Sequence, residues 1–197
     1  MKLLVATTNP NKVEEIRRVL AGTGVDLITL GPGIAAPEET GRTFEENARA
    51  KATYYAQATG ELTVAEDSGL EIDALGGMPG VESARYAGEQ TPYPEKFARL
   101  YAALDEAGGR RSAARFVCAL AVATPEAITF EARGVVEGRV AAAPSGMGGF
   151  GYDPFFFYPP YGRTLAEVTP EEKLAVSHRG QAFRRLADYL RSLKSQV

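Results

Sequence analysis

Two pairs of adjacent carboxylates are the first residues whose chemistry suggests a site. Glu38 and Glu39 follow a proline in "APEETG", and Glu66 and Asp67 close the stretch "LTVAED". We expect residues 62–66 to form a strand, and α/β proteins bind ligands beyond the carboxyl ends of such strands. Because Mg²⁺ takes one or two carboxylates and completes its octahedron with waters and phosphate oxygens, Glu38 and Asp67 are candidate ligands from separate loops. An exposed charged turn is the competing interpretation.

The segment "TTNPNK" combines hydrogen-bond donors with a cation. Residues 2–7 are expected to form a strand, and Asn9 is placed to cap the helix that follows. A strand, a polar loop and a helix N-terminus aim backbone N–H groups and the positive end of the helix dipole at one point, which suits a phosphate. Thr7, Thr8 and Asn9 add donors, and Lys12 adds a full charge. Helix capping beside a solvated lysine explains the same residues equally well, and neither a Walker loop nor a G-x-G-x-x-G after a strand is present.

A glycine-rich stretch, "GGFGYDPFFF", covers residues 148–157. Glycines let a backbone approach a ligand closely, and the rings of Phe150 and Tyr152 offer faces on which a base can stack. Asp153 precedes a proline, which favours an extended backbone there. A flexible surface loop with core aromatics is the alternative, but the density of glycines and aromatics favours a ligand-binding loop.

The segment "EEKLAVSHRG" places cations at the start of a helix. If Ser177 caps the last helix, His178 and Arg179 lie in its first turn, where positive charge opposes the helix dipole. A single histidine is more often structural, yet this pair favours a ligand with acceptor oxygens. Together with Lys173 and Lys51, these segments combine phosphate handles, a candidate metal site and a base-sized aromatic pocket. Their sum indicates a nucleoside triphosphate bound with Mg²⁺.

The elements that position these residues alternate along the chain. Strand, helix, strand, helix and strand are followed by a strand pair joined at residues 125–126 and by a last helix, an order that predicts an α/β protein with a mixed sheet. The expected strands cover residues 2–7, 25–30, 62–66, 114–124 and 127–141, and the expected helices begin near residues 10 and 43 and cover 92–107 and 177–194.

Composition limits the class of protein. A net charge of −3 argues against a general nucleic-acid binder, because such domains are usually basic. The only cysteine, Cys118, lies in an apolar run typical of a buried strand, so we expect an inert core thiol and no internal disulfide. The only histidine, His178, excludes a histidine-cluster metal site, so any metal is expected to be a hard cation on oxygen ligands, Mg²⁺ or Mn²⁺.

Length and hydropathy predict one soluble domain over residues 1–197. No apolar run approaches the roughly 20 residues that span a bilayer. The N-terminal apolar run is shorter than the h-region of a signal peptide, so we expect a cytoplasmic protein without a membrane partner.

Five motifs together resemble the inosine triphosphate pyrophosphatase family. They are "ATTNPNKVEEI", "TFEENARAKA", "AEDSGLEIDALGGMPGVESARYAG", "GGFGYDPFF" and "EEKLAVSHRGQAFRRL", and the likeness runs in order from about residue 3 to 190. The resemblance implies a two-lobed α/β fold around a long mixed β-sheet flanked by helices, with the active site in the cleft between the lobes. It also implies a homodimer and a Mg²⁺-dependent hydrolysis of ITP, dITP or XTP to the monophosphate and pyrophosphate.

The resemblance also assigns roles to residues. Asp67 matches the family's catalytic, metal-associated aspartate, with Glu38 as the second metal ligand and Glu39 as the alternative. The expected substrate-binding residues are Thr7, Thr8, Asn9, Lys12 and Lys51 on the phosphates, Ser68 beside the substrate, and Phe150, Gly151, Tyr152, Asp153, Lys173, His178 and Arg179 around the nucleoside. Donors such as Arg179 would select purines with a carbonyl at position 6 over adenine, whose amino group would leave them unpaired.

Three other classes of protein compete with this interpretation. A septum-inhibitor-type nucleotide pyrophosphatase would act on other nucleotides, and a catalytically silent nucleotide sensor would bind without turnover. A haloacid-dehalogenase phosphatase is disfavoured because "DSGLEID" lacks the D-x-D-x-[TV] pattern. The retained carboxylates and lysines argue against the silent sensor.

Overall fold

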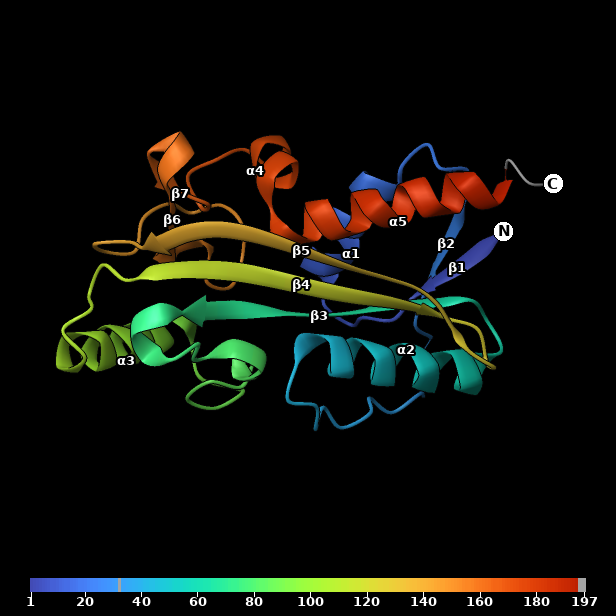
Figure 1. Cartoon of the computed structure of the whole chain (residues 1–197), viewed down its shortest axis with the longest axis horizontal. Coiled ribbons are helices and arrows are strands. Elements are labelled where there is room, and N and C mark those ends of the chain that lie inside the picture. Colours follow the sequence, from blue (N-terminus) through green and yellow to red (C-terminus); the bar gives the residue numbers. More distant parts are fainter. Residues whose placement is uncertain (32, 195–197) are drawn as a thin grey trace. The chain divides into compact units, whose positions relative to one another are not determined.

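The computed structural model describes residues 1–31 and 33–194, and its strands form a seven-stranded sheet in the order β2-β1-β3-β4-β5-β6-β7 (Figure 1). The strands are β1 (Lys2–Val5), β2 (Asp26–Thr29), β3 (Thr63–Ile72), β4 (Ala113–Ala123), β5 (Ile128–Val140), β6 (Phe156–Tyr158) and β7 (Arg163–Thr164). The α-helices are α1 (Pro10–Leu20), α2 (Phe44–Thr59), α3 (Tyr93–Glu106), α4 (Pro170–Val176) and α5 (His178–Lys194).

The sheet is mixed, as predicted. β1 pairs in parallel with β2 and with β3, whereas β6 pairs antiparallel with both β5 and β7. β4 and β5 are neighbours, and the Thr124 N–H closes the turn between them by donating to the carbonyl of Ala127 at 2.9 Å. The predicted α/β fold with a mixed sheet flanked by helices is therefore confirmed.

The chain divides into two compact units. The described parts of Met1–Asp67, Cys118–Gly134 and His178–Val197 form unit 1, and Ser68–Val117 and Val135–Ser177 form unit 2. The expected single domain over residues 1–197 and the expected cleft both stay predictions. No helix within residues 1–31 and 33–194 is long and apolar enough to cross a membrane.

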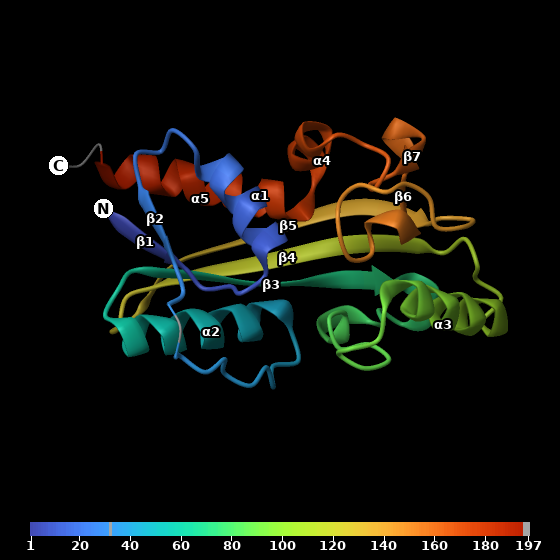
Figure 2. The same cartoon turned by 180° about the vertical axis from the view of Figure 1, so that it is seen from behind.

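Unit 1 holds helices on both faces of its strands. α1 and α5 lie side by side on one face, and α2 covers the other (Figures 1 and 2). Between α1, α5 and the strands lies an apolar core that includes Leu3, Ile16, Leu120 and Phe183. Burial of these side chains fixes the two helices against the sheet and so determines where their polar ends lie.

Helix caps in unit 1 follow the sequence signals. The Asn9 side chain accepts from the N–H of Lys12 at 3.4 Å, and the Thr43 hydroxyl accepts from the N–H of Glu46 at 3.1 Å. α2 ends at Gly60, whose φ of 72° lies in the left-handed region that glycine adopts without strain. The predicted starts of both helices are confirmed.

Unit 2 has its own aromatic core. Phe97 and Tyr101 of α3 pack on Phe155, with ring centroids 5.5 and 4.8 Å apart, and Phe116 of β4 packs on Phe156 at 4.6 Å. Offset and tilted rings at these separations are the arrangements that aromatic pairs favour. This core supports the segment that leads into β6.

Two predictions about elements were wrong, and one helix was not predicted. β3 does not end at Glu66 and Asp67 but continues to Ile72, because Leu70 and Ile72 are fully buried and carry the strand through the polar "DSG". The segment "PEEKLAV", for which the sequence analysis predicted no element, forms a separate helix, α4, whose start has a capping box between Thr169 and Glu172. The glycine-rich stretch does not stay a loop throughout, since it leads into β6.

Candidate active site

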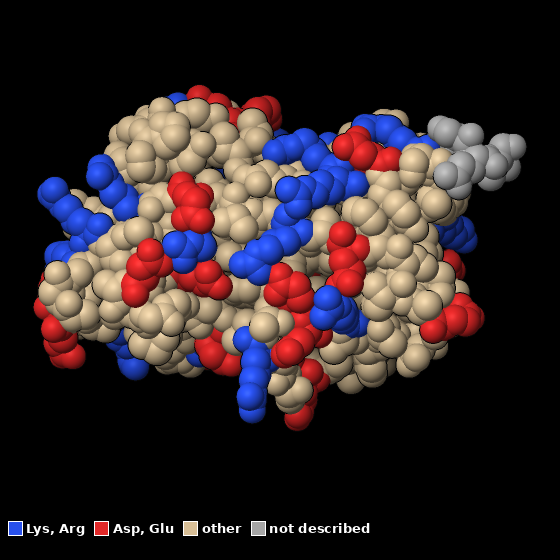
Figure 3. All heavy atoms as spheres, viewed as in Figure 1, with Lys and Arg blue, Asp and Glu red and all other residues tan. Residues whose placement is uncertain are grey.

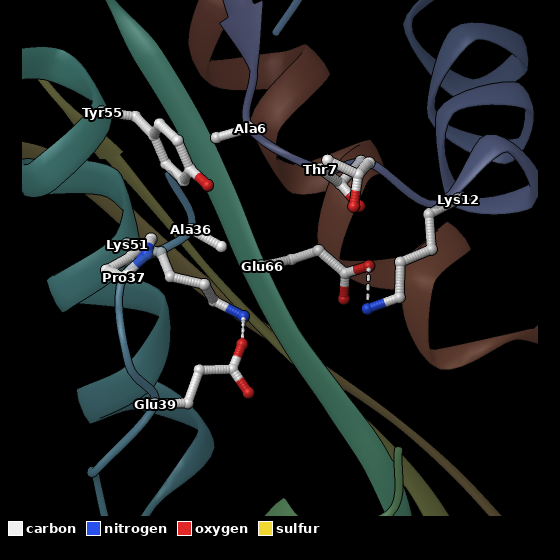
Figure 4. Close-up of a pocket in the computed structure, with 10 residues that line it drawn as sticks. Ala6, Thr7, Lys12, Ala36, Pro37, Glu39, Lys51, Tyr55 and Glu66 are labelled. Atoms are coloured by element: carbon white, nitrogen blue, oxygen red, sulfur yellow. Dashed lines mark hydrogen bonds and ion pairs between the residues drawn. The ribbon is translucent and has the colours of Figure 1, made fainter. Parts of the chain in front are cut away.

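A pocket of about 140 Å³ opens in unit 1 between the end of β1, the loop before α2, α2 itself and β3 (Figure 4). Two lysines, two carboxylates, two threonines and a tyrosine line it together with small apolar residues. The lining residues are Ala6, Thr7, Thr8, Lys12, Ala36, Pro37, Glu39, Lys51, Tyr55 and Glu66. The pocket therefore brings the two predicted phosphate-binding lysines to one place.

Lys51 of α2 lies between two carboxylates. Its Nζ is 2.5 Å from Glu39 Oε1 and 3.5 Å from Asp67 Oδ1. Burial alone would lower the pKa of Lys51, but the carboxylates of Asp67 and Glu39 outweigh it and raise that pKa above its ordinary value. Lys51 is thus a fixed cation at neutral pH.

Asp67 is buried and held from two sides. Its Oδ2 accepts a hydrogen bond from Asn47 Nδ2 at 2.9 Å, while its Oδ1 faces Lys51. Burial raises the pKa of Asp67 more than Lys51 and Asn47 lower it, and the negative charge of Glu39 raises it further. A carboxylate with a raised proton affinity, fixed in one rotamer, has the properties of a general base.

Asn47 is a site residue that our sequence analysis did not identify. It is buried, and its Oδ1 accepts from the N–H of Gly41 at 2.8 Å, so the amide group can point its donor only toward Asp67. A Cβ at Gly41 would lie 2.5 Å from Asn47 Oδ1, too close for any side chain. The available signal was an asparagine one helical turn before Lys51, on the same face of α2.

Glu66 is the centre of a buried ion network. Its Oε1 lies 3.1 Å from Lys12 Nζ and 2.9 Å from Arg179 Nε, and its Oε2 accepts from Cys118 Sγ at 3.3 Å. Arg179 Nη1 reaches Glu15 Oε2 at 2.6 Å, so the network joins β3, α1 and α5. Burial alone would raise the pKa of Glu66, but Arg179 and Lys12 hold it well below its usual range.

Glu66 and Asp67 are neighbours in β3 with different surroundings. Glu66 is bound by residues of α1 and α5, whereas Asp67 is bound by residues of α2, the helix on the opposite face of the strands (Figures 1 and 2). Successive side chains of a strand point to opposite faces, which explains the division. The exposed-turn interpretation is wrong for both residues, because both are buried.

The loop after β1 is shaped by its own side chains. Thr7 Oγ1 accepts from the N–H of Asn9 at 3.2 Å, and Asn9 Oδ1 accepts from the N–H of Asn11 at 3.0 Å. Thr7 and Thr8 line the pocket, while Asn9 is the N-cap of α1. The loop is therefore set in place beside Lys12, and phosphate binding by these residues stays a prediction.

In unit 2, Asp153 organises the glycine-rich loop. Its Oδ2 accepts from the N–H of Phe150 at 2.7 Å and from Lys173 Nζ at 2.6 Å, and Lys173 Nζ lies 4.3 Å from the centroid of the Phe150 ring. Gly149 has a φ of 66°, and a Cβ there would meet the carboxylate of Asp153. The loop is thus fixed by a buried ion pair and a cation–π contact.

Tyr152 is packed more deeply than a stacking platform requires. Its hydroxyl donates to the Ser83 carbonyl at 2.8 Å, and its ring meets the edge of Tyr93 with centroids 5.2 Å apart. Burial raises the pKa of Tyr152, so it is neutral at physiological pH. Phe150 and Gly151 are half-buried, and stacking of a base on this loop stays a prediction.

The remaining predicted residues divide between the units. Ser68, half-buried, belongs to unit 2 with the glycine-rich loop, whereas His178 and Arg179 are buried residues of unit 1. Arg179 donates from Nε and Nη1 to Glu66 and Glu15, so two of its donors are directed to carboxylates of the protein. Its expected contact with the purine stays a prediction.

The carboxylates around Lys51 fit a hard cation that arrives with phosphate. Among the described residues, no group of three or more histidine, cysteine, aspartate or glutamate side chains is arranged so that it could hold a metal ion. Mg²⁺ needs only one or two carboxylates when phosphate oxygens and waters fill its other positions. Glu39 and Asp67 meet that need, since both attract the ammonium group of Lys51. Glu39 lines the pocket, whereas Asp67 lies beside Lys51 outside the lining, and Glu38 is exposed and also outside it.

The fold and this pocket define an α/β protein with a pocket lined by two lysines and two carboxylates. The chain belongs to the Ham1 family, whose sequence model matches residues 3–189. It is 48% identical over 188 residues to a "dITP/XTP pyrophosphatase" of an Exiguobacterium species, covering 94% of this chain and 95% of the relative. A protein of the same name from Thermus thermophilus is 47% identical over 189 residues, covering 95% and 91%.

Solved structures agree with this assignment. A HAM1 protein from Coxiella burnetii superposes with a TM-score of 0.90 at 39% identity, covering 96% of this chain and 98% of that one. A structure described as a nucleoside-triphosphatase and dITP/XTP pyrophosphatase from Mycobacterium abscessus has a TM-score of 0.75 at 45% identity, covering 94% and 97%.

Proposed function

We propose that this protein hydrolyses non-standard purine nucleoside triphosphates, namely ITP, dITP and XTP, to the monophosphate and pyrophosphate. The observation that carries the proposal is the buried carboxylate of Asp67, held by Asn47 and faced by Lys51 in a chain of the Ham1 family. Relatives that share almost the full length of the chain are named dITP/XTP pyrophosphatase.

The residues of unit 1 act on the triphosphate. Water must attack a phosphorus atom whose oxygens carry negative charge, so fixed cations that offset this charge lower the barrier. Lys12 and Lys51 supply that charge, and Thr7 and Thr8 donate hydrogen bonds to the phosphate oxygens. Asp67 orients the attacking water and accepts its proton at the carboxylate oxygen that faces Lys51.

The purine nucleoside is bound by the second set of predicted residues. Phe150 and Tyr152 provide aromatic surface, and Asp153 and Lys173 fix the loop that carries them. Gly151, His178 and Arg179 complete this set, while Ser68 lies beside the substrate and Asn9 joins the phosphate-binding residues. A donor directed at purine position 6 favours the carbonyl of hypoxanthine and xanthine, whereas the amino group of adenine leaves that donor unpaired.

A divalent cation, Mg²⁺ or alternatively Mn²⁺, completes the site. When bound, this cation would act as a Lewis acid and offset the negative charge of the phosphate oxygens. Asp67 and Glu39 are the residues that would hold it, with Glu38 as the ligand expected from the resemblance. The choice of Glu39 is supported by its place in the pocket lining, on the same lysine as Asp67.

Paired variants distinguish the two candidate ligands. Glu39→Gln removes a carboxylate from the pocket and is expected to raise the Mg²⁺ concentration for half-maximal turnover by about tenfold, the effect of one lost charge-assisted ligand. Glu38→Gln is the matched control and is expected to leave that concentration unchanged. Mn²⁺ binding in the presence of tripolyphosphate, followed by electron paramagnetic resonance, gives a readout that does not depend on turnover. A larger effect from Glu38→Gln would assign the role to Glu38 instead.

Product analysis tests the proposed function directly. The purified protein is incubated with ITP, XTP, dTTP and UTP, and pyrophosphate and orthophosphate are measured separately. We expect pyrophosphate from ITP and XTP only, and no turnover after removal of divalent cations. A preference for pyrimidine nucleotides would instead support the septum-inhibitor type of pyrophosphatase, and orthophosphate as the first product would exclude both.

We also propose that the enzyme works on free nucleotides in the cytoplasm, as a homodimer. The net charge of −3 and the interspersed acidic and basic side chains on the face shown in Figure 3 support a small-molecule substrate rather than a nucleic acid. The dimer rests on the family resemblance, and sedimentation equilibrium measures it.

A further inference from the structure

Tyr55 contributes a hydroxyl group to the pocket. It lies on α2 one turn after Lys51 and lines the pocket, although only 3% of the residue is exposed. Figure 4 shows its hydroxyl oxygen directed inward among the lining side chains. No role in binding was expected for this residue from the sequence.

The hydroxyl of Tyr55 has no acceptor in the part of the chain that the structure describes. The two other buried tyrosines each donate to a backbone carbonyl, Tyr101 to Ala141 at 3.0 Å and Tyr152 to Ser83 at 2.8 Å. Buried tyrosine hydroxyls usually find such a partner. The Tyr55 hydroxyl differs from these two in that it is open to the pocket that the residue lines, where a ligand can supply the acceptor.

The surroundings of Tyr55 specify the chemistry of the missing acceptor. Glu39 in the pocket lining accepts from Lys51 at 2.5 Å, so one of its oxygens is directed to that lysine. Burial raises the pKa of Tyr55, so the phenol keeps its proton at neutral pH and acts as a donor. Lys12 and Lys51 line the pocket together with Glu39 and Glu66, so the acceptor that fits is an oxygen that the ammonium groups also attract, as a phosphate oxygen would be.

We propose that Tyr55 is a further substrate-binding residue, whose Oη donates a hydrogen bond to a phosphate oxygen of the bound triphosphate. This inference rests on the proposed function for the identity of the natural ligand. It deepens that function, because it adds a neutral donor to the two lysines and thereby gives the phosphate a preferred orientation rather than only a preferred charge.

Two adjacent tyrosines provide a matched pair of variants. Tyr55→Phe removes the hydroxyl and keeps the buried ring, whereas Tyr54→Phe makes the same change on a residue that is 38% exposed and outside the pocket lining. The probe is inorganic tripolyphosphate with Mg²⁺, measured by isothermal titration calorimetry. We expect Tyr55→Phe to raise the dissociation constant by about tenfold, the effect of one hydrogen bond to a charged group, and Tyr54→Phe to leave it unchanged.

The outcomes separate the inference from the function on which it rests. If wild type and Tyr55→Phe bind tripolyphosphate with equal affinity, the inference is overturned, because the hydroxyl then donates no hydrogen bond to the phosphate. Weaker binding by Tyr55→Phe, with no pyrophosphate released from ITP by the wild type, supports the inference and rejects the proposed function. A second measurement does not depend on the folding of the variant. In wild-type protein labelled with ¹³C at tyrosine Cζ, tripolyphosphate should shift the resonance of Tyr55 in the nuclear magnetic resonance spectrum. The absence of any shift also overturns the inference.

Discussion

Asp67→Asn is expected to lower kcat for ITP by about 10³-fold, within the range that general-base catalysis supplies. The substitution is nearly isosteric, so the packing around the buried side chain is kept, but the proton acceptor and one negative charge are lost. Binding of tripolyphosphate should remain detectable, because Lys12, Lys51 and the threonines are unchanged, although one proposed ligand of the cation is lost. The expected result is thus a protein that binds the triphosphate and does not hydrolyse it.

The measurement is steady-state release of pyrophosphate, with tripolyphosphate affinity measured on the same samples. Asp188→Asn is the control, since Asp188 is an exposed aspartate on α5 whose side chain is 78% accessible. Its kcat should match that of the wild type. Retention of full turnover by Asp67→Asn would remove Asp67 from the catalytic role.

The pH dependence of the wild type gives an independent readout of Asp67. Burial raises the pKa of Asp67 above its ordinary value. Because a general base acts in its deprotonated form, kcat/KM should rise as pH increases through this raised pKa. The acid limb should therefore lie at a higher pH than an exposed aspartate would give. An acid limb at or below the ordinary aspartate pKa would contradict the assignment.

Glu66→Gln is expected to lower the free energy of unfolding by about 3 kcal/mol, the scale for breaking a buried ion pair. Glu66 and Arg179 form an ion pair in which both side chains are almost fully buried. The substitution also removes the carboxylate that pairs with Lys12. The guanidinium of Arg179 would then keep its ion pair with Glu15 but lose the one with Glu66. Urea denaturation followed by circular dichroism measures the change.

Glu131→Gln is the matched control for Glu66→Gln. Glu131 pairs with Arg49 at 2.6 Å, but the side chains of Glu131 and Arg49 are 41% and 49% exposed. Exposed pairs contribute about 0–1 kcal/mol because water already solvates both charges. Equal losses of stability in the two variants would mean that burial does not determine the strength of the Glu66 network.

Acid should act on the same network with a defined sign. The pKa of Glu66 in the folded protein lies well below that of the unfolded chain, because Arg179 and Lys12 favour the carboxylate. The stability that Glu66 contributes is therefore present above its ordinary pKa and is lost as pH falls through the folded-state pKa. Glu66→Gln should weaken this acid dependence of stability, whereas Glu131→Gln should preserve it.

Local chemistry was predictable from the sequence, and long-range partners were not. The caps at Asn9 and Thr43 depend on residues two or three positions away, so the sequence indicates them. The pair of Glu15 with Arg179 joins residues 164 positions apart, which no local pattern reports. The sequence did single out Asp67, but as the end of a strand.

The sequence also could not distinguish between adjacent residues of the same type. Glu38 and Glu39 are identical in type, and only the path of the loop decides that Glu39 approaches Lys51. Tyr54 and Tyr55 present the same difficulty on α2, where a rotation of about 100° per residue exposes one ring and buries the other. In both pairs the fold, rather than the residue type, determines which member reaches the pocket.

The alternation of β3 has an evolutionary consequence. Glu66 and Asp67 are adjacent, yet one stabilises the network between α1 and α5 while the other faces α2. A single-residue insertion or deletion upstream in β3 would exchange the two faces, turning Asp67 away from Asn47 and Glu66 away from Arg179. The length of β3 before Glu66 is therefore expected to stay invariant among active descendants of this chain.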